Sequence, residues 1–165
     1  MKIYLIGMPG SGKTTIGRSL ADELSLSFID LDKEIEKREQ ASVAEIFSAK
    51  GEDYFRLIES QTLAEWASSV QNFVLATGGG APCFHNGMNI MNATGLTVFL
   101  DVPVDDLLLR TAKSDRPLLK SKDVDDLRKK LEALARQRLD IYKQASIIAS
   151  NPTVESILNK LQFRK

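Results

Sequence analysis

The sequence predicts an α/β domain in which helices cover both faces of a parallel sheet. Five short apolar runs alternate with longer segments of helical periodicity, which is the pattern of repeated strand–helix–strand units. The runs are almost continuously apolar, as expected for strands buried on both faces, and they span 3–6, 28–31, 73–76, 97–100 and 146–149. A glycine-rich segment joins the first run to the first helix. The predicted architecture is therefore a three-layer α/β/α domain.

The size and composition favour one compact unit over residues 1–165. A chain of 165 residues suits one domain, and 43% apolar with 27% charged residues is ordinary for a globular protein. The 22 basic residues balance the 22 acidic ones, so no positive surplus is available for a nucleic-acid backbone. We expect a monomer with no nucleic-acid partner.

The N-terminal run and the cysteine content bear on the compartment. The apolar run 3–6 is too short for a secretory signal or a membrane span. The single cysteine, Cys83, cannot form an internal disulfide, which is typical of a reducing compartment. We therefore expect a cytoplasmic protein that does not associate with membranes.

Helix signals divide the segments between the predicted strands. Ser42 and Glu45 form a capping box, and Gly51 is expected to end that helix before a second one over 52–69. Further helices are predicted over 15–24, 123–142 and 154–162. Between 111 and 123 the periodicity fails and the chain is polar, charged and interrupted by Pro117. We predict a mobile lid over about 112–122.

The strongest motif is the segment 7–14, Gly-Met-Pro-Gly-Ser-Gly-Lys-Thr, which satisfies G-x-x-x-x-G-K-[ST] between a strand and a helix. Its glycines let backbone N–H groups turn inward around an anion, at the positive end of the helix dipole. Lys13 supplies a point charge for the outer phosphates, and the hydroxyl of Thr14 suits Mg²⁺. The predicted nucleotide contacts are Gly10, Ser11, Gly12, Lys13, Thr14 and Thr15.

Two carboxylates follow the second apolar run. Asp30 and Asp32 are two residues apart, so on one strand they would face the same way, beyond its carboxyl end. One could hold hydrated Mg²⁺ and the other could meet an acceptor hydroxyl. The alternative is that Asp32 only caps a helix beginning at Lys33.

Two further segments are candidates for the acceptor side. Arg56 and Glu59 lie one helical turn apart, which by itself indicates an ordinary surface ion pair. The three consecutive glycines 78–80 directly follow the third predicted strand. A bare backbone of that kind is costly unless another group must approach it closely, which favours a binding role.

Together these motifs resemble those of the shikimate kinase family, in that family's order and over essentially the whole chain. The resemblance rests on the segments 7–14, 28–36, 55–59, 76–80, 115–119 and 138–142. It implies a nucleoside-monophosphate-kinase-like fold with sheet order 2-3-1-4-5 and an acceptor-binding region over about 32–60. It also implies transfer of a phosphate from ATP, with Mg²⁺, to the 3-hydroxyl of shikimate in aromatic amino acid biosynthesis.

The resemblance also implies a role for each matching residue. Lys13 would clamp the phosphates, Thr14 and Asp30 would serve Mg²⁺, and Asp32 would bind the acceptor hydroxyls and act as the base or position the hydroxyl. The acceptor would further contact Arg56, Gly78, Gly79, Gly80 and Arg138. Arg110 would stack on adenine, and Arg116 would close from the lid over the phosphates. The last motif lacks the proline that the family often carries there, and Arg136 competes with Arg138, which has the preferred spacing to Tyr142.

Two other functions are compatible with the phosphate-binding motif alone. One is a different small-molecule kinase, acting on gluconate or a nucleoside monophosphate. The other is a nucleotide-dependent switch, which has no need of paired arginines. Turnover of ATP with a small acceptor, and without a protein partner, distinguishes a kinase from a switch.

Overall fold

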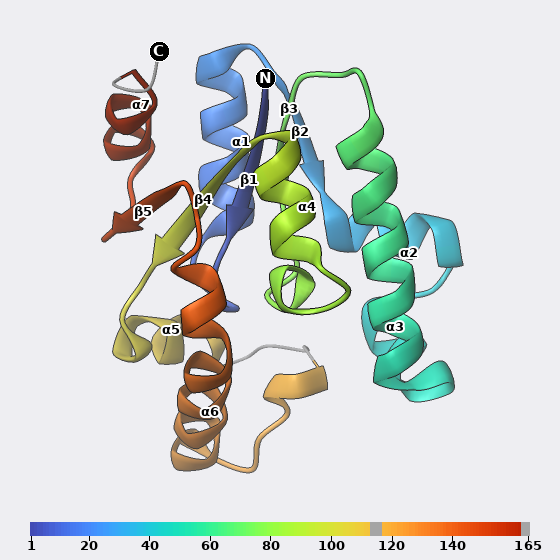
Figure 1. The fold of residues 1–165 in the computed structure, drawn as a ribbon. Coiled ribbons are helices and arrows are strands. Elements are labelled where there is room, and N and C mark those ends of the chain that lie inside the picture. The colour runs from blue at the N-terminus through green and yellow to red at the C-terminus, as the bar shows by residue number, and fades with distance from the viewer. Residues whose placement is uncertain (113–116, 163–165) are drawn as a thin grey trace.

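The computed structural model describes residues 1–112 and 117–162 and contains one five-stranded sheet (Figure 1). Its strand order is β2-β3-β1-β4-β5, and every neighbouring pair is parallel. The strands are β1 (Lys2–Ile6), β2 (Ser27–Asp30), β3 (Phe73–Ala76), β4 (Leu96–Asp101) and β5 (Ile147–Ser150). The predicted α/β class and the order 2-3-1-4-5 are confirmed.

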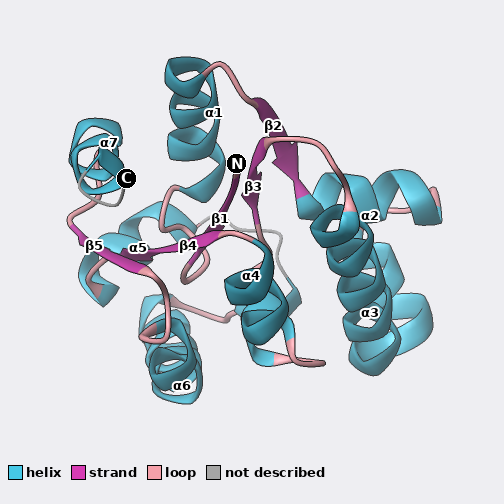
Figure 2. Ribbon diagram, turned by 45° about the horizontal axis from the view of Figure 1, so that its top comes forward, coloured by secondary structure: helices cyan, strands magenta, loops and turns pink. Residues whose placement is uncertain are grey.

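Helices cover both faces of this sheet, which gives the predicted three layers (Figure 2). One face carries α1 (Lys13–Leu24) and α7 (Val154–Gln162), and the other carries α3 (Val43–Ser68), α4 (Gly87–Thr94) and α6 (Val124–Tyr142). The remaining elements are α2 (Leu31–Glu39), α5 (Val104–Thr111) and the short 3-10 turns η1 (Ala81–Cys83) and η2 (Pro117–Leu119). No helix in these two described ranges is long and apolar enough to cross a membrane.

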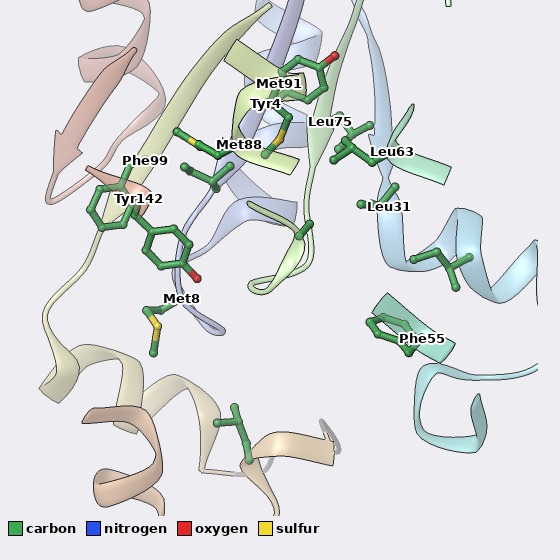
Figure 3. Close-up of a cluster of buried hydrophobic side chains, with 14 of the residues drawn as sticks. Tyr4, Met8, Leu31, Phe55, Leu63, Leu75, Met88, Met91, Phe99 and Tyr142 are labelled. Atoms are coloured by element: carbon green, nitrogen blue, oxygen red, sulfur yellow. The ribbon is translucent and has the colours of Figure 1, made fainter. Parts of the chain in front are cut away.

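Alternate residues of each central strand enter two separate cores. Ile3 and Leu5 of β1 pack with α1 and α7, whereas Tyr4 and Ile6 pack toward α3, α4 and α6 (Figure 3). All four side chains are fully buried. Both faces of β1 are therefore apolar, which is why its sequence shows no polar alternation.

The boundary between β2 and α2 differs from the sequence-based expectation. β2 ends at Asp30, and Asp32 lies in the first turn of α2, so the two carboxylates do not share a strand. It is Asp30, not Asp32, that caps this helix, because its side chain accepts from the N–H of Lys33. The capping interpretation of Asp32 is thus wrong.

The helix signals around Gly51 are confirmed. The capping box of Ser42 and Glu45 is present in both directions. Gly51, with φ 82° and ψ 173°, interrupts the helical backbone, so that α3 consists of two helices joined at a kink. That backbone conformation is essentially restricted to glycine. After the kink, Arg56 and Glu59 lie against Gly80 and Gly78 of the loop that follows β3.

The carboxyl ends of β1, β2 and β3 meet at one edge of the sheet (Figure 1). The glycine-rich loop follows β1, α2 follows β2 and the triple glycine follows β3. In open α/β sheets ligands bind in the crevice beyond the carboxyl ends of the strands. The fold therefore gathers three of the predicted motifs in one place.

Candidate active site

The loop from Gly7 to Thr14 surrounds the beginning of α1. Gly10 and Gly12 have φ values of 80° and 92°, and Gly12 is the N-cap of the helix. A cavity of about 560 Å³ opens at this helix end. Its lining includes Gly10, Gly12, Lys13, Thr14 and Thr15. Exposed N–H groups at a positive dipole end, facing an open cavity, make a site for an anion.

Lys13 is held inside this loop rather than extended into solvent. Its Nζ donates to the carbonyls of Gly7 and Met8, at 2.9 Å each, and to Ser11 Oγ at 3.4 Å. Only 5% of the residue is exposed. The loop carbonyls therefore fix the ammonium beside the cavity, where its charge can act on a bound phosphate.

Two oxygen donors stand together at the same cavity. Thr14 Oγ1 donates to Asp30 Oδ2 at 3.1 Å, and both residues line the cavity. Hydroxyl and carboxylate oxygens suit Mg²⁺, which usually keeps several waters and takes further ligands from phosphates. The donor set thus fits a Mg²⁺–nucleotide complex.

Arg110 also lines the cavity at the start of α1. Its Nη1 donates to the carbonyl of Gly10 at 3.2 Å, and Ile16 and Pro152 line the cavity with it. A guanidinium plane beside apolar side chains can stack on a planar base. Pro152 was not among the sequence candidates, because a proline before a helix is usually only an N-terminal signal.

A second pocket adjoins the first through Asp32, which lines both. It has an open volume of about 60 Å³ and is built from α2, α3, the loop after β3, η2 and α6. Its polar lining consists of Asp32, Arg56, Glu59 and Arg138, together with the glycine backbone 78–80. Its apolar lining includes Phe47, Phe55 and Leu134. Carboxylates, guanidinium groups and bare backbone suit a small, polar, acidic molecule.

Each of the three glycines makes room for a different charged side chain. A Cβ on Gly78 would lie 2.6 Å from Glu59 Oε1, and one on Gly80 would lie 2.3 Å from Arg56 Nη1. A Cβ on Gly79 would lie 2.9 Å from Arg138 Nη1. None of these glycines has a positive φ. They are needed for close approach rather than for backbone conformation, as the sequence argument expected.

Arg56 is a buried part of this pocket, so the surface ion pair expected from its helical spacing is wrong. Its Nη1 donates to Glu59 Oε2 at 2.8 Å, and its Nη2 lies 3.2 Å from Glu52 Oε1. The guanidinium carbon also lies 4.6 Å from the centre of the Phe84 ring. Arg56 and Glu59 are only 5% and 1% exposed. The pair therefore orients the guanidinium within the pocket.

Glu59 is the functional candidate that the sequence argument missed. Its Oε1 is the one buried side-chain polar atom without a hydrogen-bond partner in the part of the chain that the structure describes. The pKa of its carboxyl is raised from 4.5 to about 7, mainly by burial, with a smaller contribution from nearby Asp32 and against the opposing effect of Arg56. An oxygen without a partner, beside Gly78 in the lining of the second pocket, can accept a hydrogen bond from a ligand.

Comparison with known proteins decides which family has this arrangement. A sequence model described as shikimate kinase matches residues 9–162. This chain belongs to the shikimate kinase family. A shikimate kinase of Bacteroides thetaiotaomicron is 43% identical over 157 residues, covering 94% of this chain and 89% of that protein. One from Azobacteroides pseudotrichonymphae is 40% identical and covers 97% of this chain and 99% of its own length.

Solved structures of shikimate kinases have the same fold. Shikimate kinase from Acinetobacter baumannii in complex with shikimate aligns with a TM-score of 0.92 at 35% identity. The alignment covers 99% of this chain and 94% of that one. The resemblance inferred from the motifs is confirmed.

The shikimate kinase fold also separates the two competing arginines. Arg138 is buried and lines the second pocket, which is called the acceptor pocket below. Arg136 is exposed, and its Nε contacts the carbonyl of Glu132 on the same helix at 3.4 Å. Of these two arginines, Arg138 is therefore the one whose side chain lines this pocket.

The predicted lid is described only in part. Arg116, the predicted lid arginine, lies outside the described residues. Pro117, Leu118 and Leu119 form η2 and line the acceptor pocket, and Leu119 is buried. The C-terminal part of the predicted lid segment thus contributes to the wall around the acceptor.

The raised pKa of Glu59 predicts a pH effect on stability. The carboxyl of Glu59 binds its proton more tightly in the folded state than in the unfolded chain. The contribution of this proton to the free energy of unfolding is therefore complete below pH 4.5 and is lost as pH rises to about 7. We expect the Glu59→Gln variant to lack this loss, which has an upper limit of about 3 kcal/mol. Urea denaturation at several pH values measures the difference between variant and wild type.

Glu65→Gln is the matched control for this experiment, because Glu65 lies on the same helix with an exposed side chain. Its pH profile should follow that of the wild type. Identical profiles for the wild type and Glu59→Gln would show that Glu59 does not titrate in this range.

Proposed function

We propose that this shikimate kinase transfers the γ-phosphoryl group of ATP to the 3-hydroxyl of shikimate, giving shikimate 3-phosphate and ADP. Shikimate kinase activity, the use of ATP and the place in aromatic amino acid biosynthesis follow from the family. The observation that carries the finer proposal is the shared wall of the two cavities, where Asp32 lines both. A donor phosphate and an acceptor hydroxyl can meet at that carboxylate.

On the donor side, the loop 7–14 and Lys13 would bind the β- and γ-phosphates. Thr14 and Asp30 would hold Mg²⁺, which when bound neutralises charge on the phosphates. Arg110 would stack on the adenine from the end of the cavity that it shares with Pro152. These groups position the phosphate and stabilise its charge, which is the main task of a protein in phosphoryl transfer.

On the acceptor side, Arg56 and Arg138 would bind the carboxylate of shikimate. Two guanidinium groups suit one carboxylate because each offers paired N–H donors. Asp32 would accept a hydrogen bond from the reacting hydroxyl and then take its proton, or hold the hydroxyl in line with the phosphate. The backbone of Gly78, Gly79 and Gly80 would supply further donors, and Glu59 Oε1 an acceptor.

The remaining parts of the proposal concern the lid and the state of the protein. Arg116 would approach the phosphates when the lid 112–122 closes, and would stabilise the charge of the transition state. A balanced net charge is consistent with a cytoplasmic monomer. Hydrogen exchange in 112–122 should slow when both substrates bind, and exchange that ignores both would contradict closure.

The test of the proposed function is ADP release from ATP and Mg²⁺ with different acceptors. We expect release with shikimate, without any protein partner, and a product whose phosphate is on the 3-hydroxyl by phosphorus NMR. Gluconate and a nucleoside monophosphate serve as comparison acceptors. Release with either of these but not with shikimate would contradict the proposal.

A further inference from the structure

Tyr142 is a buried tyrosine whose hydroxyl hydrogen-bonds to the loop after β3, which contains Gly78, Gly79 and Gly80. It lies at the C-terminal end of α6, is 1% exposed and packs against Phe99 in the larger core (Figure 3). It follows Arg138 by four residues, so both side chains are on one face of the helix. Both residues are buried, and both side chains lie against Gly79 in the loop after β3.

The hydroxyl of Tyr142 donates to the carbonyl of Gly79, with an O···O distance of 2.6 Å. The carbonyls on either side have backbone partners, because Ala81 N–H donates to Gly78 and Cys83 N–H to Gly80. Within residues 1–112 and 117–162, the carbonyl of Gly79 has no backbone donor. Tyr142 is therefore the group that holds the middle of the triple glycine.

Fixing this carbonyl also fixes the peptide that it belongs to. A trans peptide is planar, so the N–H of Gly80 points opposite to the carbonyl of Gly79. Gly79 and Gly80 line the acceptor pocket, whereas Tyr142 does not. Among the backbone hydrogen bonds of the described part of the chain, none is donated by the N–H of Gly78, Gly79 or Gly80. The hydrogen bond thus draws the carbonyl toward the core and leaves the opposite side of the peptide for a ligand.

Arg138 also lies against Gly79. Its Nη1 would lie 2.9 Å from a Cβ on Gly79, so the guanidinium packs directly on the glycine that Tyr142 holds. Burial raises the pKa of the Tyr142 phenol, so the hydroxyl remains a donor throughout the neutral range. The contact does not depend on pH there.

We propose that Tyr142 is a positioning residue for the acceptor half of the site. Its hydroxyl sets the orientation of the Gly79–Gly80 peptide and the surface against which Arg138 rests, so that both meet the acceptor in one arrangement. This inference rests on the proposed function, and it assigns Tyr142 no contact with ATP or with the reacting atoms.

The test compares Tyr142→Phe with Tyr4→Phe in the full chain. Tyr4 is also fully buried in the same core, and its hydroxyl pairs with Thr94 Oγ1 at 2.9 Å. Neither Tyr4 nor Thr94 lines the nucleotide cavity or the acceptor pocket. Each variant therefore removes the hydrogen bond of one core tyrosine, which is partly buried for Tyr4 and buried for Tyr142, but only Tyr142 contacts the loop of Gly78, Gly79 and Gly80.

For Tyr142→Phe we expect the KM for shikimate to rise about five- to tenfold, with the KM for ATP within about twofold of the wild type. Tyr4→Phe should leave both KM values within about twofold. An unchanged shikimate KM in Tyr142→Phe, or an equal rise in both variants, would show that Tyr142 is only structural. A wild type without activity on shikimate would remove the proposed function itself, and this inference with it.

A second measurement needs no variant and guards against poor folding of Tyr142→Phe. In the wild-type chain, the amide resonances of Gly79 and Gly80 should shift when shikimate is added. Amide resonances that stay unchanged at saturating shikimate would overturn the proposal.

Discussion

Asp32→Asn should lower kcat by about 10²- to 10⁴-fold, the largest effect expected for a single substitution in this protein. Asp32 is half-buried in the first turn of α2 and lines both cavities. Asparagine has the same shape but cannot take the proton of the acceptor hydroxyl or attract it as an anion. Because the loss concerns the reacting atoms, the KM for ATP should change little. Steady-state ADP release with shikimate measures both constants.

Asp22→Asn is the matched control, since Asp22 is an exposed aspartate of α1 that lines neither cavity. It should leave kcat within about twofold, as surface substitutions rarely have larger effects. A near-normal kcat for Asp32→Asn would remove Asp32 from any role in proton transfer. A raised shikimate KM with unchanged kcat would assign it to binding alone.

Arg56→Lys should weaken binding of shikimate by about 1.5–3 kcal/mol. The guanidinium contacts Glu52 and Glu59 at once, and a lysine ammonium cannot keep both contacts and also offer paired donors to a carboxylate. We expect a higher KM for shikimate and little change in the KM for ATP. Binding measured by calorimetry without ATP separates this effect from the chemical step.

The control for this substitution is Arg38→Lys, which changes an arginine paired with Glu65 on the surface. Exposed ion pairs contribute little, so both KM values and the stability should remain close to those of the wild type. If Arg56→Lys binds shikimate as tightly as the wild type, Arg56 holds the pocket together but does not contact the acceptor.

The order of the elements could be predicted because their signals are local. The strand 73–76 and the helix 154–162 have the predicted bounds, since apolar runs and a preceding proline mark them in the sequence itself. The same holds for the capping box at Ser42 and Glu45, which needs two residues of one turn. The motif at 7–14 likewise is local, because it joins the end of β1 directly to the beginning of α1.

The acceptor side was harder to predict because its contacts join distant segments. The spacing of Arg56 and Glu59 is the same for a surface pair and a buried one. Only the packing of α3 against the triple glycine shows that this pair is buried. Asp32 was expected on a strand because the end of β2 lies one residue away from the start of a helix, where apolar periodicity cannot distinguish the two.

The sequence also gave no sign that Tyr142 bonds to Gly79, which lies 63 positions away along the chain. Its spacing to Arg138 was visible, but the partner of its hydroxyl depends on how α6 docks on the loop after β3. A side chain that supports a binding loop without lining the pocket, such as Tyr142, is therefore found from the structure. The residues of a glycine-rich loop are found from the sequence.

A crystal structure with ADP, Mg²⁺ and shikimate tests most directly whether donor and acceptor meet at Asp32. We expect the shikimate carboxylate between Arg56 and Arg138, the 3-hydroxyl within hydrogen-bond distance of Asp32, and the ADP phosphates in the loop 7–14. Shikimate bound away from these side chains, or a 3-hydroxyl turned away from the nucleotide, would contradict the account.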